Sequence, residues 1–127
     1  MPFETKWIVE PYVLLFRQEG VTGSEEFTQS LQAVLDIMNN QIHPVHFVVD
    51  LSNVERFSAN ITKIPAAYEV VRHPHFGWVG IVGSTALISF WMQLLARTSN
   101  FRFKLFPTVE DATEFMLEIV RNASDKI

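Results

Sequence analysis

The sequence has no cysteine, no excess of basic side chains and no long run of apolar residues. The absence of cysteine excludes disulfide frameworks, thiolate zinc sites and cysteine nucleophiles. Lysine and arginine number 10 against 14 acidic residues, and the formal charge of -4 argues against a nucleic-acid-binding surface, which needs clustered basic side chains. The longest apolar stretch covers only residues 86–96, far fewer than the roughly 20 residues that cross a bilayer.

The sequence does contain enough apolar material for a folded domain. Hydrophobic residues make up 48% of the 127 residues, and a chain of this length removes roughly two-thirds of its unfolded surface from water on folding. No linker, repeat or low-complexity segment divides residues 1–127, so we expect a single domain. The first residues lack the basic and apolar regions of a signal peptide, and the expected location is therefore the cytoplasm.

Short apolar segments alternate with longer segments of helical periodicity, a pattern typical of an α/β sheet. Helices are expected after Thr22, over 61–72, over 86–98 and from Thr108 to about residue 122. Strands are predicted over residues 6–10, 12–17, 46–51, 78–82 and 101–106. The tight connection between the first two strands indicates that they are antiparallel. The predicted architecture is an α/β fold with a mixed, mostly parallel five-stranded sheet and about four helices, in the order β-β-α-β-α-β-α-β-α.

Two threonines are expected to begin helices. Thr22 is followed three residues later by Glu25, which is the pattern of a capping box. Thr108 precedes Glu110 and Asp111, and acidic side chains are favourable in the first turn of a helix. The pattern therefore predicts Thr22 and Thr108 as the N-caps of the first and last helices.

The central segment 47–54 (FVVDLSNV) and the closing segment 106–112 (FPTVEDA) resemble the STAS domains. These are the modules of anti-sigma-factor antagonists of the SpoIIAA type and of their lipid-transfer-like relatives. The resemblance covers nearly the whole chain and implies the same α/β fold. It also implies a regulatory function through contact with partner proteins.

In the family that the sequence resembles, a serine at a helix start receives a phosphate group. Counting without gaps from Asp50, the family's Asp-Ser-Ser motif falls on Ser58, Ala59 and Asn60, so asparagine stands at the phosphoacceptor position. A slip of two residues would make Ser58 the acceptor, without the preceding acid and the following glycine. The alternative is that Ser58, Asn60 or Thr62 caps the second helix.

A second candidate site lies where two parallel strands are expected to end. Asp50 ends one strand, and Ser84 and Thr85 follow the next. Ligands of α/β folds bind beyond the carboxyl ends of the strands, so these side chains could form a small polar pocket, or the site of a small hydrolase-like enzyme. Alternatively, Asp50 binds loop amides and Ser84 or Thr85 caps the third helix.

The remaining polar residues do not predict a metal site, a cofactor site or a nucleophile. The histidines form two pairs, His43 with His46 and His73 with His75, toward the starts of two strands. A metal site needs three or four converging ligands. No Gly-x-Ser-x-Gly elbow is present.

The third predicted helix is apolar over about 200° of its circumference at about 100° per residue, more than a helix packed on a sheet usually buries. The excess can be covered by a neighbouring helix, a second subunit or an apolar ligand. Our first hypothesis is a non-catalytic interaction module, with a homodimer or protein partner contacted by Ile88, Trp91, Met92 and Leu95. The alternative is a carrier for an apolar, lipid-like small molecule, bound in a pocket lined by residues such as Phe57, Tyr68 and Phe90.

Overall fold

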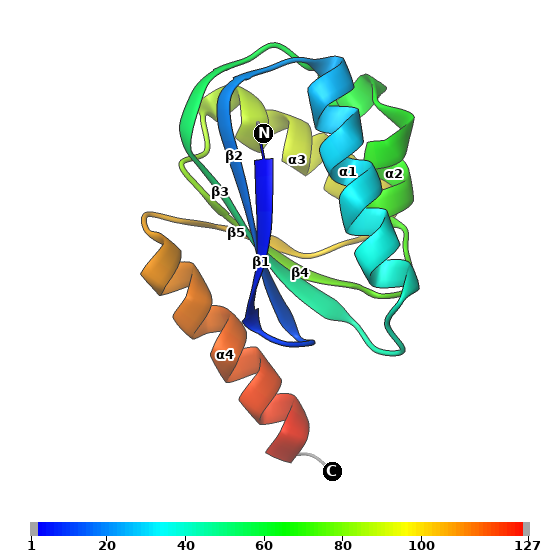
Figure 1. Cartoon of the computed structure of the whole chain (residues 1–127), viewed down its shortest axis with the longest axis vertical. Coiled ribbons are helices and arrows are strands. Elements are labelled where there is room, and N and C mark those ends of the chain that lie inside the picture. Colours follow the sequence, from blue (N-terminus) through cyan, green and yellow to red (C-terminus); the bar gives the residue numbers. More distant parts are fainter. Residues whose placement is uncertain (1–2, 126–127) are drawn as a thin grey trace.

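The computed structural model describes residues 3–125 and has one five-stranded sheet with helices on both faces (Figure 1). The strands are β1 (Phe3–Val9), β2 (Val13–Thr22), β3 (Val45–Phe57), β4 (Phe76–Val82) and β5 (Phe103–Phe106). The helices are α1 (Ser24–Asn39), the 3-10 helix η1 (Ile61–Lys63), α2 (Pro65–Val71), α3 (Ala86–Ser99) and α4 (Val109–Asp125). The predicted order of strands and helices is confirmed, with η1 added.

The spatial order of the strands follows the sequence, from β1 to β5. β1 pairs with β2 in antiparallel orientation, whereas β2 to β5 are parallel neighbours. The predicted mixed, mostly parallel sheet is therefore confirmed. Because parallel neighbours require a crossover, each of the later strands is separated from the next by a helix.

Alternation along β2 divides the apolar residues between two cores. Leu14 and Phe16 face α1, α2 and α3 and belong to the larger core. Val13 and Leu15 face the opposite side and pack in a smaller core that includes Met116 of α4. In Figure 1, α4 accordingly lies on the other side of the sheet from α1 and α2. Both faces of the central strands are thus covered, as expected for parallel strands.

The starts of the first two helical regions differ from the prediction. Gly23, not Thr22, is the N-cap of α1, because Thr22 is the last residue of β2 and its side chain is buried. The predicted helix over 61–72 is divided into η1 and α2 by Ile64, whose backbone is extended. Pro65 follows Ile64, and a residue before proline avoids the helical conformation.

The last helix begins as predicted. Thr108 Oγ1 accepts a hydrogen bond from the Asp111 backbone N–H over 3.1 Å, and Glu110 and Asp111 occupy the first turn. Within residues 3–125, no helix has both the length and the hydropathy needed to cross a membrane.

Candidate functional site

The helices α1, α2 and α3 leave an apolar cavity of about 100 Å³ between themselves and the sheet. Phe16 of β2 and Phe57 of β3 lie in its strand wall, and Ala67 of α2 lies in its helical wall. The other lining residues include Phe27, Leu31, Val34, Phe47, Val49, Leu51, Val70, Val79, Ile81, Ile88, Met92 and Leu95.

Within the part of the chain that the structure describes, every side chain that lines this cavity is a hydrocarbon or a thioether, and none is charged or carries an amide or hydroxyl group. Protein interiors are normally close-packed, and empty space costs about 24 cal/mol per Å³. The cavity is partly open, so on the order of 2.4 kcal/mol is the upper limit of what about 100 Å³ costs while it is empty. Apolar cavities of about 150 Å³ stay dry and accept a molecule such as benzene.

The third helix contributes to this cavity the residues that were predicted to form an interface. Ile88, Met92 and Leu95 are buried in the core at exposures of 4%, 8% and 1%, and they line the cavity. The prediction of a partner contact is wrong for these three positions, because their side chains are covered by the chain's own sheet and helices. Trp91 is half-buried and packs against Phe57, with 6.3 Å between the ring centroids.

The exposed apolar surface of α3 lies elsewhere on the helix. Leu87 and Phe90 are 52% and 55% exposed, respectively. They are three residues apart and so lie on one face of the helix. The chain therefore covers only part of the excess apolar surface that the sequence predicts for this helix.

Of the residues predicted to line a pocket for an apolar ligand, one is confirmed and two are not. Phe57 lines the cavity, but Tyr68 and Phe90 do not. The Tyr68 hydroxyl donates a hydrogen bond to the Thr62 carbonyl over 2.8 Å. Phe90 points to solvent, because the sheet-facing side of α3 is the side of Ile88 and Met92.

Two buried polar side chains of β2 were not predicted from the sequence. Gln18 and Thr22 are both 0% exposed, yet among residues 3–125 the side-chain nitrogen and oxygen of Gln18 and the hydroxyl of Thr22 have no hydrogen-bond partner. The predicted strand stopped at residue 17. Had the alternation of Leu14 and Phe16 been continued, it would have placed Gln18 on the buried face.

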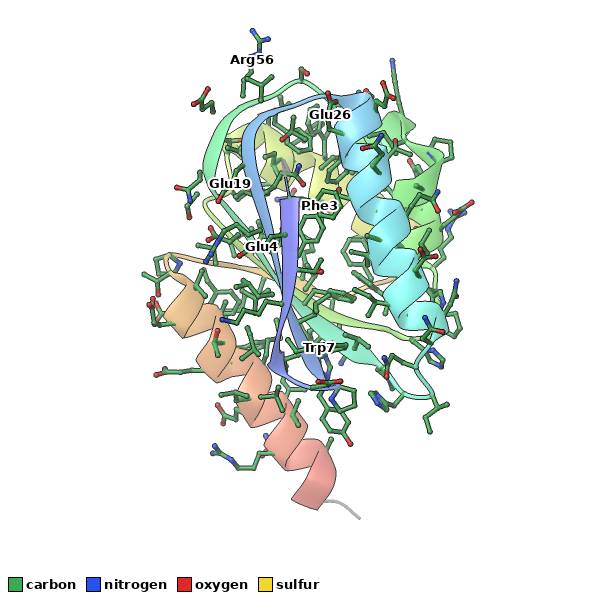
Figure 2. All side chains as sticks on the ribbon, in the orientation of Figure 1. Phe3, Glu4, Trp7, Glu19, Glu26 and Arg56 are labelled. Atoms are coloured by element: carbon green, nitrogen blue, oxygen red, sulfur yellow. The ribbon has the colours of Figure 1, made fainter. Side chains whose placement is uncertain are left out.

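The neighbouring residues of β1 show how the two faces of the sheet differ. Phe3 is the register partner of Gln18 and stacks on Phe16, with 5.9 Å between the ring centroids. Glu4, next along β1, contacts Arg17 on the opposite face. In Figure 2, Phe3 accordingly lies toward α1, and Glu4 lies on the other side of the strand. Gln18 is thus in an apolar environment, while charged residues gather on the other face.

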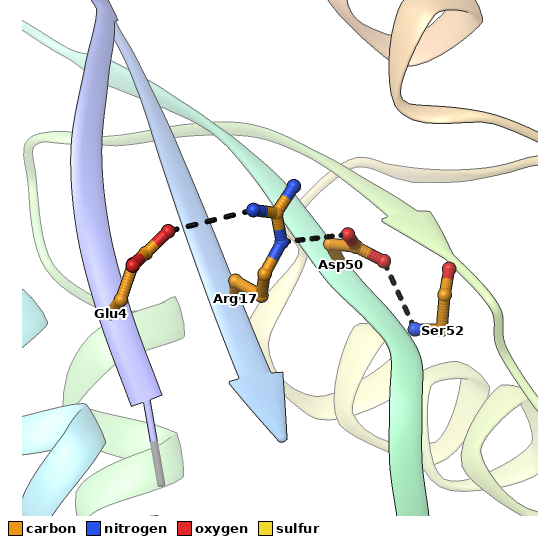
Figure 3. A network of polar contacts seen from close by, with 4 residues as sticks. All are labelled: Glu4, Arg17, Asp50 and Ser52. Carbon is orange, nitrogen blue, oxygen red and sulfur yellow. Dashed lines mark hydrogen bonds and ion pairs between the residues drawn. The ribbon is translucent and has the colours of Figure 1, made fainter. Parts of the chain in front are cut away.

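Asp50 belongs to a polar network on that other face of the sheet (Figure 3). Arg17 Nε donates to Asp50 Oδ2 over 3.0 Å, and the Ser52 backbone N–H donates to Asp50 Oδ1 over 3.0 Å. Arg17 Nη1 also reaches Glu4 Oε1 at 3.5 Å. Burial of Asp50 opposes ionisation, but the hydrogen bonds from Ser52 and Arg17 and the charge of Arg17 outweigh it and lower the pKa of this carboxyl.

The hydroxyls expected to join Asp50 have other partners. Thr85 caps α3, because its side-chain oxygen accepts from the Ile88 backbone N–H over 3.2 Å. Ser84 Oγ lies 2.9 Å from Ser89 Oγ in the same helix region. Over residues 3–125, no hydrogen bond links Asp50 to Ser84 or Thr85. The predicted helix cap at Thr85 is therefore confirmed. Asp50 binds the amide of Ser52 within β3 and not a loop amide, because β3 continues to Phe57 instead of ending near Asp50 as predicted.

Asn60 has a capping role at the position that corresponds to the family's phosphoacceptor. Its side-chain oxygen accepts from the Thr62 backbone N–H at 3.0 Å and from the Thr62 hydroxyl at 2.6 Å. It caps η1, the short helix before α2. Ser58 is exposed and donates a hydrogen bond to the Thr22 carbonyl over 3.3 Å. Phosphorylation of Ser58 stays a prediction.

The histidines make local contacts, and within one pair the His75 backbone N–H donates to His73 Nδ1 over 3.0 Å. His46 Nδ1 accepts a hydrogen bond from the Trp78 backbone N–H over 3.0 Å. Burial, and to a smaller extent Arg102 and His43, lower the pKa of His46 below its ordinary value. His73 Nε2 lies 2.8 Å from Asn39 Oδ1. Across the described part of the chain, no three histidine or acidic side chains gather in a way that could hold a metal ion.

Comparison with known proteins relates the chain to one structural group. No protein-family model and no curated protein matches it. Among solved structures, it is similar to an uncharacterised protein of the DUF3478 family with a SpoIIAA-like fold from Shewanella loihica PV-4. The two chains are 16% identical with a TM-score of 0.63, over 90% of this chain and 91% of the other. The chain therefore has the SpoIIAA-like α/β fold that its resemblance to STAS domains implied.

Proposed function

We propose that this chain is a non-catalytic binding module that holds a small apolar molecule between the sheet and helices α1, α2 and α3. The apolar cavity of about 100 Å³ carries this proposal. A ligand in that space would restore the van der Waals contacts that the lining side chains lack. This was our alternative hypothesis from the sequence, and the burial of Ile88, Met92 and Leu95 around the cavity favours it over a protein contact at those residues.

The size and lining of the cavity limit the class of ligand. A volume of about 100 Å³ is of the order needed for a single aromatic ring or a short hydrocarbon segment. None of the described side chains that line the cavity is charged, and an ion within it would lose its hydration without gaining a partner. The apolar part of the ligand is therefore small and uncharged.

Toluene binding and native mass spectrometry test this proposal. We expect toluene to raise the melting temperature of the wild-type protein, because it binds the folded state and not the unfolded chain. Native mass spectrometry of protein purified from cells is expected to show a retained small molecule that is lost on denaturation. If the protein retains no added mass and toluene leaves its melting temperature unchanged, the proposal is wrong.

The exposed face of α3 favours a second candidate function, contact with a protein partner. Leu87 and Phe90 are both more than half exposed, and exposed large apolar side chains that adjoin one another are typical of interaction surfaces. We propose a second copy of the chain as the partner, as our first hypothesis from the sequence expected. In this candidate the interface residues are Leu87 and Phe90 beside Trp91.

Light scattering tests this candidate function, because it measures whether the protein is a monomer or a dimer. We expect a dimer for the wild type and a monomer for Phe90→Glu, because a charge would be buried in the interface. Gln32→Glu is the control for the added charge, since Gln32 is an exposed polar residue on α1, away from this face of α3. A wild type that stays monomeric at high micromolar concentration would rule out the homodimer.

A further inference from the structure

The strand β1 is an edge of the sheet, and its outer side has no partner in the described part of the chain. It pairs only with β2, at one end of the strand order from β1 to β5. In Figure 1, β1 lies in front of the other strands, and no helix crosses in front of it. The backbone N–H and C=O groups on its outer side are therefore available to another strand.

The side chains of β1 alternate between the two faces of the sheet. Phe3 and Trp7 pack on the larger core, on the side of α1, α2 and α3. Glu4 and Lys6 point to the other face, and both are exposed, as is Thr5 between them. Among residues 3–125, Lys6 forms no ion pair. Two opposite charges on one face and two aromatic rings on the other thus lie symmetrically about Thr5.

This arrangement is self-complementary in one antiparallel register. When two β1 strands pair with Thr5 opposite Thr5, Glu4 of each copy lies opposite Lys6 of the other. Phe3 then lies opposite Trp7. Opposite charges, aromatic pairs and threonine pairs are all favourable across the strands of an antiparallel sheet. The contact is isologous, so the charge pair and the aromatic pair each occur twice.

Other registers of the same two strands are unfavourable. Symmetric pairing centred on Glu4 or on Lys6 places two like charges directly opposite each other, which is destabilising. A shift by a single residue places outward-facing backbone groups opposite groups that face β2. The other edge strand, β5, has four residues with one lysine and no acidic side chain, so two β5 strands would have no opposite charges to pair.

We propose that two copies of the chain pair through β1 in antiparallel orientation, with Thr5 at the two-fold axis, so that two five-stranded sheets become one continuous sheet. This inference goes beyond the binding function, because no residue from Phe3 to Trp7 lines the apolar cavity. It also uses a different surface from the contact through Leu87 and Phe90 of α3.

Two charge-reversal variants test the pairing by light scattering over a concentration series. Glu4→Lys places lysines opposite one another in the symmetric dimer, and Lys6→Glu places glutamates opposite one another. We expect each variant alone to dimerise about tenfold more weakly than wild type. Both positions are exposed, so the variants should fold. An equimolar mixture of the two should recover the wild-type affinity, because the lysines of one variant then face the glutamates of the other.

Recovery in the mixture separates this interface from other causes of dissociation. A variant that is misfolded, or that has lost a contact elsewhere, does not regain affinity from the second variant. If each variant dimerises as strongly as wild type, or if the mixture stays monomeric, the β1 interface is refuted. A wild type that is monomeric at high micromolar concentration refutes it as well. Toluene binding is measured separately, so these outcomes leave the apolar binding function to its own test.

Discussion

The substitution Ala67→Leu tests directly whether the space between the helices and the sheet is empty in the ligand-free protein. Ala67 is 3% exposed on α2 and lines the cavity. Leucine adds three carbon atoms at this position and is nearly as favourable as alanine within a helix. We expect the added atoms to occupy the cavity and to stabilise the ligand-free protein.

Two independent calculations give the upper limit of this stabilisation. Three buried carbon atoms at about 0.8 kcal/mol each contribute about 2.4 kcal/mol. Filling a cavity of about 100 Å³ at about 24 cal/mol per Å³ removes the same amount of cavity cost. Because one side chain does not match the cavity shape fully, we expect about 1 kcal/mol, which corresponds to roughly 4 °C in melting temperature for a chain of this size.

Ala66→Leu is the matched control. Ala66 is the neighbouring residue of α2, is 5% exposed and does not line the cavity. The same three carbon atoms should therefore overpack the core there and cost about 1–3 kcal/mol. Urea unfolding of wild type and both variants measures the difference, and toluene should stabilise wild type but not Ala67→Leu.

An equal loss of stability in Ala67→Leu and Ala66→Leu would show that the region around Ala67 is already filled. The free-energy cost assigned to the empty cavity and the proposal that a ligand binds there would then both be refuted. A stabilised Ala67→Leu that still binds toluene would place the toluene site elsewhere in the protein.

Three further predictions concern the polar contacts. Asp50→Asn should lower the free energy of unfolding, measured in urea near pH 7, by about 1–2 kcal/mol. This is less than for a fully buried ion pair, because Arg17 is partly exposed. Since the fold lowers the pKa of Asp50, the ionised carboxylate should stabilise the protein fully above about pH 3.9, and this stabilisation should be lost as the pH falls through the lower pKa of the folded state. Identical acid unfolding curves of wild type and variant would contradict this. The fold also lowers the pKa of His46, so the unfolded chain binds the proton more readily, and stability should fall as the pH drops below about 6.5. His46→Asn supplies an amide oxygen to the Trp78 N–H and should weaken the pH dependence of the melting temperature. If the melting temperatures of wild type and variant change equally with pH, His46 has no part in this dependence. Asn60→Ala should lower the free energy of unfolding by about 1 kcal/mol because it removes the cap of η1, whereas Asn60→Asp keeps the acceptor oxygen and should leave this free energy unchanged. Equal urea midpoints for the two variants would show that the cap does not stabilise the protein.

Local patterns along the chain were sufficient for the order of the helices and strands. The N-cap at Thr108 and the strand around Asp50 were predictable because each depends on a few adjacent residues. Thr22 was misassigned as a cap because the same residue type suits a helix start and the end of a strand. Pairing with Phe57 of β3, which is distant in sequence, extends β2 as far as Thr22.

The candidate site was predicted only in part, and α3 shows why. The sequence indicates that this helix has more apolar surface than one sheet contact buries, but an apolar arc of about 200° leaves the rotation of the helix undetermined. Packing against the sheet buries Ile88, Met92 and Leu95 and leaves Leu87 and Phe90 exposed. That choice depends on the shape of the opposing strands, which no pattern within the helix contains.

The sequence by itself determined the α/β class, the order of the elements and the excess of apolar surface on α3, because hydrophobic periodicity and capping act over a few residues. Only the tertiary structure decided that Ile88, Met92 and Leu95 surround a cavity together with Phe16 and Phe57. The tertiary structure alone also decided that the polar atoms of Gln18 and Thr22 are buried without a hydrogen-bond partner among the described residues. Cavities and unpaired groups arise from how distant segments fit together, so they depend on side-chain shapes across the whole core.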